Sequence, residues 1–172
     1  MKVFLIIAVA YVASSIILYF CMRKKCRKDM VFQAPKSRAV YYILSFTWGL
    51  PMTFFGCIVA LGLLITGHKP KRYGWDFCFE FESIGWGLEL GLFFIAPTNS
   101  ELTNQHEHGH GIQNIYLGIF TPAVVSIPSA IRFWYREIRY NIGKPCKTKY
   151  DDIWFEGSAT ASGKALMERL KK

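Results

Sequence analysis

A pentapeptide in the middle of the chain combines the residue types of a metal site. Residues 106–110 read H-E-H-G-H, which fits the pattern H-E-x-x-H. On a helix, positions four residues apart lie on one face, so His106 and His110 can present two imidazoles to a single cation. Glu107, the next residue round the helix, can then reach a water bound to that cation. The spacing predicts a metal site with a general base. The alternatives are a polar helix start and a histidine cluster that binds metal without catalysis.

The sequence around this motif predicts a helix. Residues 98–101 read T-N-S-E, which fits a capping box with Thr98 as the N-cap and Glu101 three residues later. The segment then continues without proline to about residue 117, and Pro122 is expected to stop it. On this helix His108 faces away from the other two histidines. We interpret it as a residue that supports the site indirectly or is solvated, with contact to substrate as the alternative.

The order of these residues is the zinc-metallopeptidase pattern, in which two histidines hold Zn²⁺ and the glutamate is the general base. A catalytic zinc ion usually has three protein ligands and keeps a fourth position for water. No third histidine follows shortly after the motif. The downstream candidates are therefore Glu137, Cys146, Asp151, Asp152, Glu156 and Glu168.

Glu156 is the third ligand that we favour. The small residues Gly157, Ser158 and Ala159 follow it, so its carboxylate can be pressed closely against another helix. Asp152 lies four residues earlier, on the same face of a helix, and could orient a ligand histidine. The alternative is that Glu156 is a surface residue of its helix.

The order of these motifs also resembles the motif order of a known protein family. H-E-x-x-H followed by a glutamate on a second helix looks like the gluzincin metallopeptidases. It resembles in particular their small membrane-embedded branch, with the CAAX prenyl protease and bacterial heat-shock membrane protease types. The resemblance covers roughly residues 74–163 and implies a zinc site made of His106, His110 and Glu156. A full-size protease of this branch has more helices than this chain can hold, so the resemblance implies neither a substrate nor an activity.

Three stretches carry the resemblance most closely. They are N-Q-H-E-H-G-H-G-I-Q-N at 104–114, I-P-S-A-I at 127–131 and W-F-E-G-S-A-T at 154–160. They resemble a group of uncharacterised bacterial membrane proteins that typically read H-E-x-G-H-x-x-Q, I-P-S and then T/F-E-x-x-A.

The composition separately predicts an integral membrane protein. Apolar residues make up 52% of the chain, yet its net charge is +9. Residues 3–22 form a nearly uninterrupted apolar run, long enough to cross ~30 Å of hydrocarbon, and a basic cluster follows at 23–28. We interpret this run as an uncleaved anchor, with a signal peptide as the alternative. A second apolar block, residues 39–66, predicts a transmembrane helix kinked at Pro51, or else a tight hairpin.

The position of Glu156 constrains how the chain crosses the membrane. Between the histidine ligands and Glu156 lies one more apolar stretch, residues 112–134, which contains Pro122 and Pro128. A single crossing there would place Glu156 on the opposite side from the histidines, where it could not share their ion. We therefore predict a proline-broken helix that is associated with the membrane without crossing it. The basic and aromatic residues from Arg132 onward then fit the headgroup region.

The side of the membrane that holds the site stays open. Seven lysines or arginines occupy residues 23–38, so the positive-inside rule places this linker in the cytoplasm. A single crossing by residues 39–66 would then place the site outside, which we favour. Residues 69–72 are basic as well, however, and a hairpin would return the site to the cytoplasm.

A strand pair is predicted before the metal-site helix. Residues 75–82 alternate aromatic and polar side chains, the period of a half-buried strand, and residues 87–95 follow a turn with glycine. We predict a β-hairpin beside the helix, whose edge could bind substrate as an added strand. A hydrophobic lid is the alternative.

The predicted fold is a mainly α membrane protein with a small α+β zincin-like domain. Residues 1–67 are expected to hold two transmembrane helices and their basic linker. Residues 68–172 are expected to form the metal-binding domain, with the hairpin, the H-E-x-x-H helix, the membrane-associated segment near 112–134 and a C-terminal helix.

These features together predict a membrane-bound zinc metallopeptidase. Zn²⁺ held by His106, His110 and Glu156 would activate a water, and Glu107 would accept its proton and pass it to the leaving amine. The candidates for stabilising the oxyanion are Tyr150, His108 and an arginine between residues 132 and 139.

The expected location is the cell membrane, as a multi-pass integral protein. The expected partners are the lipid bilayer and a peptide or protein substrate near it, and no nucleic acid. One rival is a non-catalytic membrane protein with a structural metal site or an accessory role. Another is a membrane-surface binder with incidental histidines. Glu107 favours the peptidase, because a structural site needs no base.

Overall fold

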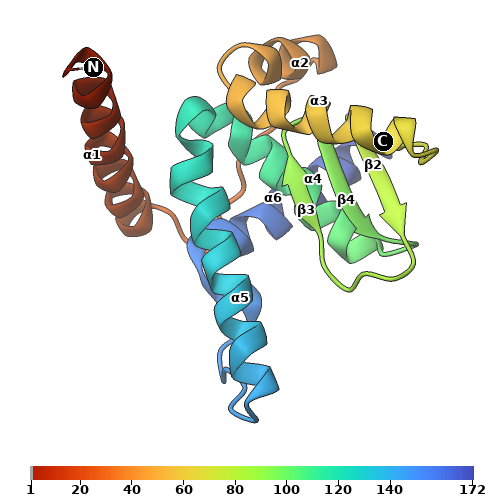
Figure 1. Ribbon diagram of the computed structural model, residues 1–172. Helices are drawn as coiled ribbons and strands as arrows, with labels where there is room; N and C mark the ends of the chain where they lie inside the picture. Colours follow the sequence, from red (N-terminus) through yellow and green to blue (C-terminus); the bar gives the residue numbers. More distant parts are fainter. Residues whose placement is uncertain (1) are drawn as a thin grey trace.

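The computed structural model describes residues 2–172, which are mostly helical with one small sheet (Figure 1). The helices are α1 (Lys2–Lys25), α2 (Arg38–Phe46), α3 (Leu50–Ile65), α4 (Glu101–Leu117), α5 (Ile127–Asn141) and α6 (Trp154–Leu170). The strands are β1 (Lys71–Tyr73), β2 (Asp76–Phe81), β3 (Leu88–Leu90) and β4 (Phe93–Pro97). The short helical turns are η1 (Gly118–Phe120), η2 (Pro122–Ser126) and η3 (Tyr150–Asp152). The prediction of a mainly helical chain with a small β component is confirmed.

Within residues 2–172, α1 is the one helix that is long and apolar enough by itself to cross a membrane. Its 24 residues extend ~36 Å at the usual helical rise. Ser15 is its only buried residue, and most of the helix stands apart from the rest of the molecule (Figure 1). Three basic residues end it. The first predicted membrane segment, residues 3–22, is therefore a continuous apolar helix.

The second apolar block is not one helix. Residues 39–66 divide into α2 and α3, whose axes differ by 91°. The break lies at residues 47–49, and Pro51 falls in the first turn of α3, where a proline is tolerated because its missing N–H has no partner to lose. The predicted single helix kinked at Pro51 is therefore wrong. α3 alone, with 16 residues, extends ~24 Å, less than a ~30 Å hydrocarbon core.

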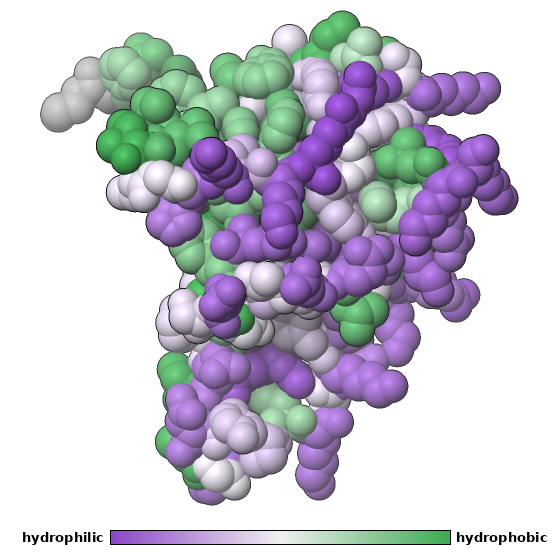
Figure 2. Space-filling view, turned by 90° about the vertical axis from the view of Figure 1, so that its right-hand side faces the viewer, coloured by the Kyte–Doolittle hydropathy of each residue, from purple (hydrophilic) through white to green (hydrophobic). Residues whose placement is uncertain are grey.

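Apolar surface is concentrated on α1, α2 and α3. Phe54, Ile58 and Leu61 of α3 are more than half exposed, as is Ile43 of α2. Figure 2 shows hydrophobic residues gathered mainly toward the upper left of the view, with mainly hydrophilic residues over its right-hand side and lower part. This division is typical of a protein that meets lipid at one end.

The sheet has the order β1-β2-β4-β3. β2 pairs with β4 in parallel, while β1–β2 and β3–β4 are antiparallel pairs. The predicted hairpin between residues 75–82 and 87–95 is therefore wrong. The second stretch divides at Gly91 into β3 and β4, and this extra reversal makes β4 parallel to β2. β3 becomes an edge strand next to α4.

Gly91 makes this reversal possible. Its φ of 76° lies in the left-handed region, which glycine adopts without steric cost. A Cβ at this position would also lie 2.4 Å from the Cα of Thr53 in α3. The tight turn and the close approach of α3 both require glycine here.

α4 and α6 approach each other until their backbones touch. A Cβ at Gly109 of α4 would lie 1.8 Å from the carbonyl oxygen of Ala159 of α6. A Cβ at Gly163 of α6 would lie 1.8 Å from the carbonyl oxygen of Gln105. The expectation that small residues after Glu156 allow a close helix contact is confirmed. The partner is the helix that carries H-E-x-x-H.

α4 begins two residues later than predicted. Ser100 is the N-cap residue in place of Thr98, and its hydroxyl lies 2.8 Å from the Thr103 hydroxyl instead of capping a backbone N–H. Asn99, between them, has a φ of 59°, so Thr98 lies outside the helix. The left-handed turn at Asn99 thus replaces the predicted capping box.

The chain turns sharply between α4 and α5. α4 ends at Leu117, Gly118 has a φ of 57°, and η2 begins at Pro122. The two helical arms differ in direction by 115°. The predicted proline-broken helix is therefore present. Its association with a membrane stays a prediction.

One hydrophobic core connects the chain after α1 to the later helices. Its large buried members include Phe32, Tyr41, Trp75, Ile112 and Phe155. The Phe32 N–H also donates to Ser162 Oγ at 2.8 Å, and Arg169 donates to the carbonyl oxygen of Ala34. The linker between α1 and α2 is thereby fixed against α6.

Candidate metal centre

α4 and α6 bring together the three side chains predicted as ligands. His106 and His110 lie one turn apart on α4, and Glu156 lies in the first turn of α6. The two Nε2 atoms are 3.1 Å apart, and they lie 3.1 and 3.3 Å from Glu156 Oε2. The three residues thus form one group that could hold a metal ion.

The size of this triangle fits a small tetrahedral cation. With metal–ligand distances of about 2.0–2.1 Å, neighbouring ligand atoms of a tetrahedron lie about 3.3–3.4 Å apart. The three separations, 3.1, 3.1 and 3.3 Å, are close to this edge length. Two imidazoles and a carboxylate suit zinc and some other transition metals better than calcium or magnesium, which prefer oxygen ligands.

The surroundings of Glu156 also favour a bound cation. Its side chain is fully buried, and its Oε1 has no hydrogen-bond partner among the described residues. Burial by itself would raise the pKa of Glu156, but hydrogen bonds from His106 and His110 hold it well below the usual range. A buried ionised carboxylate is costly unless positive charge faces it, and a metal ion supplies that charge.

Gln113 orients His110. The Nδ1 of His110 lies 2.9 Å from Gln113 Oε1, an acceptor, so Nδ1 donates to the amide and Nε2, the atom that would bind a metal, faces the cluster. The Gln113 amide donates to the carbonyl oxygen of Phe155 at 2.7 Å and to Ser158 Oγ at 2.8 Å. These contacts on both sides of Glu156 fix the amide. No role was predicted for Gln113, although its position three residues after His110 places it within reach.

Thr160 and Asp151 orient His106 in the same way. The Nδ1 of His106 lies 2.8 Å from Thr160 Oγ1, and the Thr160 hydroxyl donates to Asp151 Oδ2 at 3.1 Å. Because the hydroxyl proton is committed to Asp151, Thr160 accepts a hydrogen bond from Nδ1, and Nε2 of His106 is the atom left to bind a metal.

The prediction that Asp152 orients a ligand histidine is wrong. Asp152 pairs instead with Lys28 at 2.6 Å. The prediction assumed that Asp152 and Glu156 share one helix, but Asp152 lies in η3 and α6 begins only at Trp154. The helical spacing of four residues therefore does not apply between them.

Glu107 lies between the ligands and the edge of the sheet. Its carboxylate is buried against the chain entering β3, where a Cβ at Gly87 would lie 2.2 Å from Glu107 Oε1. Burial raises the pKa of Glu107, and the charges of His106 and His110 oppose this rise. A raised pKa makes the Glu107 carboxylate a stronger base for a nearby proton.

His108 belongs to a different cluster. It is fully buried, and its Nδ1 contacts Asp76 Oδ2 of β2. Tyr41 donates to the same carboxylate oxygen at 3.2 Å. The interpretation of His108 as solvated is therefore wrong, and its direction toward β2 removes it from the oxyanion candidates. The reason is that β2 packs on the face of α4 that carries His108, a contact that the local sequence does not specify.

Tyr150 is the oxyanion candidate that lies beside the ligands. Its ring centre is 6.1 Å from that of His106, and its hydroxyl lies 3.3 Å from Ser129 Oγ. Burial and the charge of Glu156 raise its pKa above the usual value, so the phenol keeps its proton. Arg132 and Arg136 both lie over its ring, at 5.6 and 5.9 Å.

Comparison with protein-family models, with curated proteins and with solved structures gave no match to this chain. The fold and the cluster together define a small, mainly helical protein with one apolar anchor-like helix and a buried two-histidine, one-glutamate centre.

Proposed function

We propose that this protein is a membrane-attached zinc metallopeptidase of the gluzincin type, with His106, His110 and Glu156 as ligands and Glu107 as general base. The observation that carries the proposal is the convergence of the two Nε2 atoms and Glu156 Oε2 within 3.3 Å of one another, beside the buried Glu107. Supporting contacts from Gln113 and Thr160 point both histidine lone pairs at the same position.

A zinc ion bound there would act as a Lewis acid that makes a water nucleophilic near neutral pH and polarises a peptide carbonyl. Glu107 accepts the proton of the attacking water and delivers it to the leaving amine. Its burial against Gly87 keeps bulk water away and holds the carboxylate in place.

The edge strand β3 supports a binding mode for an extended peptide. It lies at the end of the sheet order, and the entry to it packs on Glu107. Leu88 at its start is exposed, so an extended peptide could approach this end of the edge from solvent. Addition of a substrate strand to this edge would bring its peptide bonds alongside the metal position. Tyr150, with its proton retained, donates to the developing oxyanion.

The location that we propose is a membrane, with α1 as an anchor and the bent α2–α3 pair as a second membrane segment of a multi-pass protein. The length and apolar surface of α1 support the first part. The exposed apolar residues of α3 support the second.

The test combines metal analysis with a peptidase assay on the full chain in detergent. The parent protein should contain one equivalent of zinc and cleave members of a fluorescence-quenched peptide library. Glu107→Gln should keep the zinc and lose cleavage, because the ligands remain while proton transfer is lost. Glu137→Gln, on the exposed side of α5, is the matched control and should change neither.

Two results would overturn the proposal. Unchanged turnover of Glu107→Gln would remove Glu107 from the mechanism. Full zinc occupancy without cleavage of any library member would favour a structural metal site in a non-catalytic membrane protein.

A further inference from the structure

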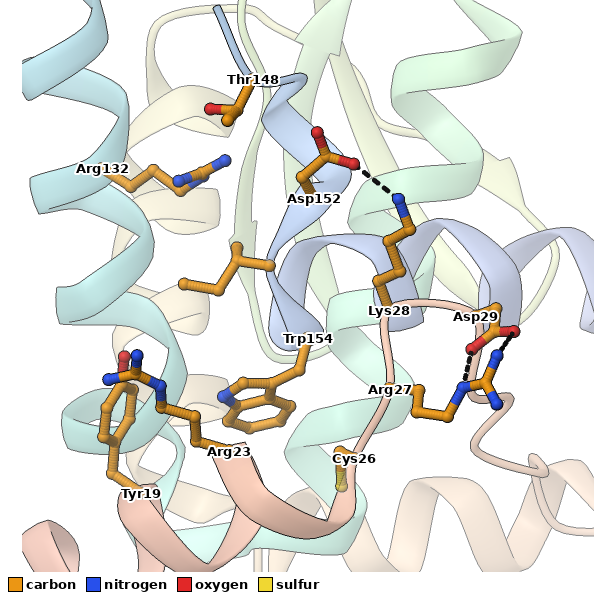
Figure 3. A pocket seen from close by; sticks show the side chains of 11 residues that line it. Tyr19, Arg23, Cys26, Arg27, Lys28, Asp29, Arg132, Thr148, Asp152 and Trp154 are labelled. Atoms are coloured by element: carbon orange, nitrogen blue, oxygen red, sulfur yellow. Dashed lines mark hydrogen bonds and ion pairs between the residues drawn. The ribbon is translucent and has the colours of Figure 1, made fainter. Parts of the chain in front are cut away.

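Two cavities meet between α1, α5 and the chain that leads into α6. One, of about 700 Å³, lies at the C-terminal end of α1 and is lined mainly by charged and polar residues (Figure 3). The other, of about 580 Å³, runs between α1 and α5 and is lined mainly by apolar residues. Tyr19, Arg132 and Ile153 line both, so they form one groove with a basic end and an apolar end.

The basic end has two arginines without an acidic partner. Arg27 pairs with Asp29 at 2.9 Å, and Lys28 pairs with Asp152 at 2.6 Å. Arg23 makes no ion pair among the described residues. Arg132 also makes none there.

Arg132 is held in place while part of its guanidinium stays available. Its Nε and Nη2 donate to the carbonyl oxygens of Lys149 and Tyr150, at 2.8 to 3.0 Å. Within residues 2–172, its Nη1 makes no hydrogen bond. Figure 3 shows Arg132 and Arg23 extending from two different helices that flank the cavity, Arg132 toward Thr148 and Asp152 and Arg23 beside Tyr19 and Trp154. Two unneutralised guanidinium groups at one cavity favour an anion with several oxygen acceptors.

Trp154 supplies an independent indication of a ligand. Its side chain lines the basic cavity and is only 4% exposed, yet its indole N–H has no hydrogen-bond partner among the described residues. Figure 3 shows the indole nitrogen on the side of the ring that faces Tyr19 and Arg23. A buried N–H without an acceptor is costly and rare. An oxygen acceptor that enters beside the exposed, flexible Arg23 side chain would satisfy it.

The apolar end has the length of one bilayer leaflet. Along α1 the lining extends from Val12 to Phe20, and Arg23 follows one turn later. The eleven steps along the helix from Val12 to Arg23 extend roughly 16 Å, about half of a ~30 Å hydrocarbon core. Ile127 and Ile131 of α5 line the opposite side and are more than half exposed. One acyl chain can therefore lie along the groove while its headgroup reaches the arginines.

We propose that this groove is a specific site for an anionic glycerophospholipid, with the phosphate between Arg23 and Arg132, the Trp154 N–H as a further donor, and an acyl chain between α1 and α5. The inference rests on the membrane location in the proposed function, and it is independent of the peptidase chemistry. A net anionic lipid is preferred to a zwitterionic one, because no carboxylate is left to pair with a choline or ethanolamine group: Asp29 and Asp152 are already engaged.

The site also connects lipid to the metal centre. Arg132 fixes the backbone of Tyr150, and Tyr150 lies beside His106. A phosphate on Arg132 therefore stabilises the segment that places Tyr150.

The experiment uses the full chain in nanodiscs of equimolar palmitoyl-oleoyl phosphatidylglycerol and phosphatidylcholine, with retained lipid identified by native mass spectrometry after gentle release. The parent should retain one phosphatidylglycerol. Arg23→Gln should reduce this retention by at least about tenfold, the effect of losing a hydrogen bond to a charged group. Lys24→Gln is the matched control: it removes the same charge from the same helix end but does not line the groove.

A second variant tests the apolar end. Ile131→Trp should fill the groove and reduce lipid retention, while leaving the arginines and the zinc content unchanged. Equal loss in Arg23→Gln and Lys24→Gln would show diffuse surface attraction only and overturn the site. Equal retention of phosphatidylcholine by the parent would overturn it as well.

The same experiment separates this inference from the proposed function. Failure of the chain to enter nanodiscs would overturn the membrane location and the lipid site together. Lipid selectivity that persists in Glu107→Gln, whatever the outcome of the peptidase assay, would uphold the lipid site by itself.

Discussion

Gly109 of α4 and Ala159 of α6 meet backbone to backbone, so closely that a Cβ at Gly109 would lie 1.8 Å from the Ala159 carbonyl oxygen. Gly109 directly precedes the candidate ligand His110, and Ala159 lies three residues after the candidate ligand Glu156. The contact therefore sets the distance between the two halves of the metal centre. A larger separation of the helices would move Glu156 Oε2 away from both imidazoles.

Replacement of Gly109 by alanine should separate α4 from α6. We expect Gly109→Ala to lower the free energy of unfolding by about 1–3 kcal/mol, the usual cost of forced overpacking, and to weaken zinc binding. The measurements are denaturant unfolding in detergent and zinc retention against a chelator. Gly62→Ala in α3 is the control, because a Cβ there meets nothing within 4 Å. Equal behaviour of the two variants would contradict the role of the close contact.

Glu156→Ala should weaken zinc binding more than replacement of Gln113 or Thr160, which only orient the histidines. A catalytic zinc site needs a third protein ligand, and Glu156 is the carboxylate that meets both imidazoles. Glu156→Asp should be intermediate, because the carboxylate is retained but set back by one methylene. Zinc retention during a chelator challenge compares these variants with Glu137→Ala and Glu168→Ala, which should behave as the parent does. Parent-like retention by Glu156→Ala would place the third ligand elsewhere, with Asp151, which reaches His106 through Thr160, as the next candidate.

Gln113→Leu should weaken zinc binding by about 10–100-fold, the usual effect of losing a group that orients a ligand histidine. Without the amide oxygen, the proton on His110 Nδ1 has no acceptor and the ring loses its fixed orientation. Competition with a fluorescent chelator measures the affinity. Gln105→Leu is the matched control on the same helix, since the Gln105 side chain donates to Glu101 and not to a candidate ligand. A loss in both variants would indicate a general effect on α4.

The free energy of unfolding should depend on pH in part because of Glu89. This buried carboxyl has its pKa raised by burial from 4.5 to about 8. Between these two values the folded protein keeps the proton that the unfolded chain releases, so stability should fall as the pH rises through this window. In metal-free protein, Glu89→Gln should remove this slope, measured as the unfolding midpoint at several pH values. Glu168→Gln, at an exposed position, should leave it unchanged.

Reporters fused after Gly67 and after Lys172 should lie on the same side of the membrane. His110 and Glu156 contact each other at 3.3 Å, so residues 112–134 between them must return to the side from which they start. The measurement is the accessibility of each reporter tag from outside intact cells or spheroplasts, compared between the two fusion sites. Reporters found on opposite sides would contradict a shared metal site in the folded chain.

The sequence by itself determined the features that depend on neighbouring residues. The spacing of His106 and His110 needs only one turn of helix to place both rings on one face. An uninterrupted apolar run makes α1, because no charge or proline falls within residues 3–22. The small residues after Glu156 indicated a close helix contact, since side-chain size alone limits how near two backbones can come. These features were predictable because their physical causes are local.

Tertiary structure decided the features in which distant segments choose among partners. The four-residue spacing of Asp152 and Glu156 suggested a shared helix, but the chain bends before α6, and Lys28 from the other end of the chain takes Asp152 while Asp151 reaches Thr160. The alternating pattern of β2 did not specify its neighbour. Gly91 reverses the chain and places β4 there in parallel. His108 looked solvated until β2 covered it. In each case the sequence pattern was compatible with several partners, and the packing of the whole chain selected one.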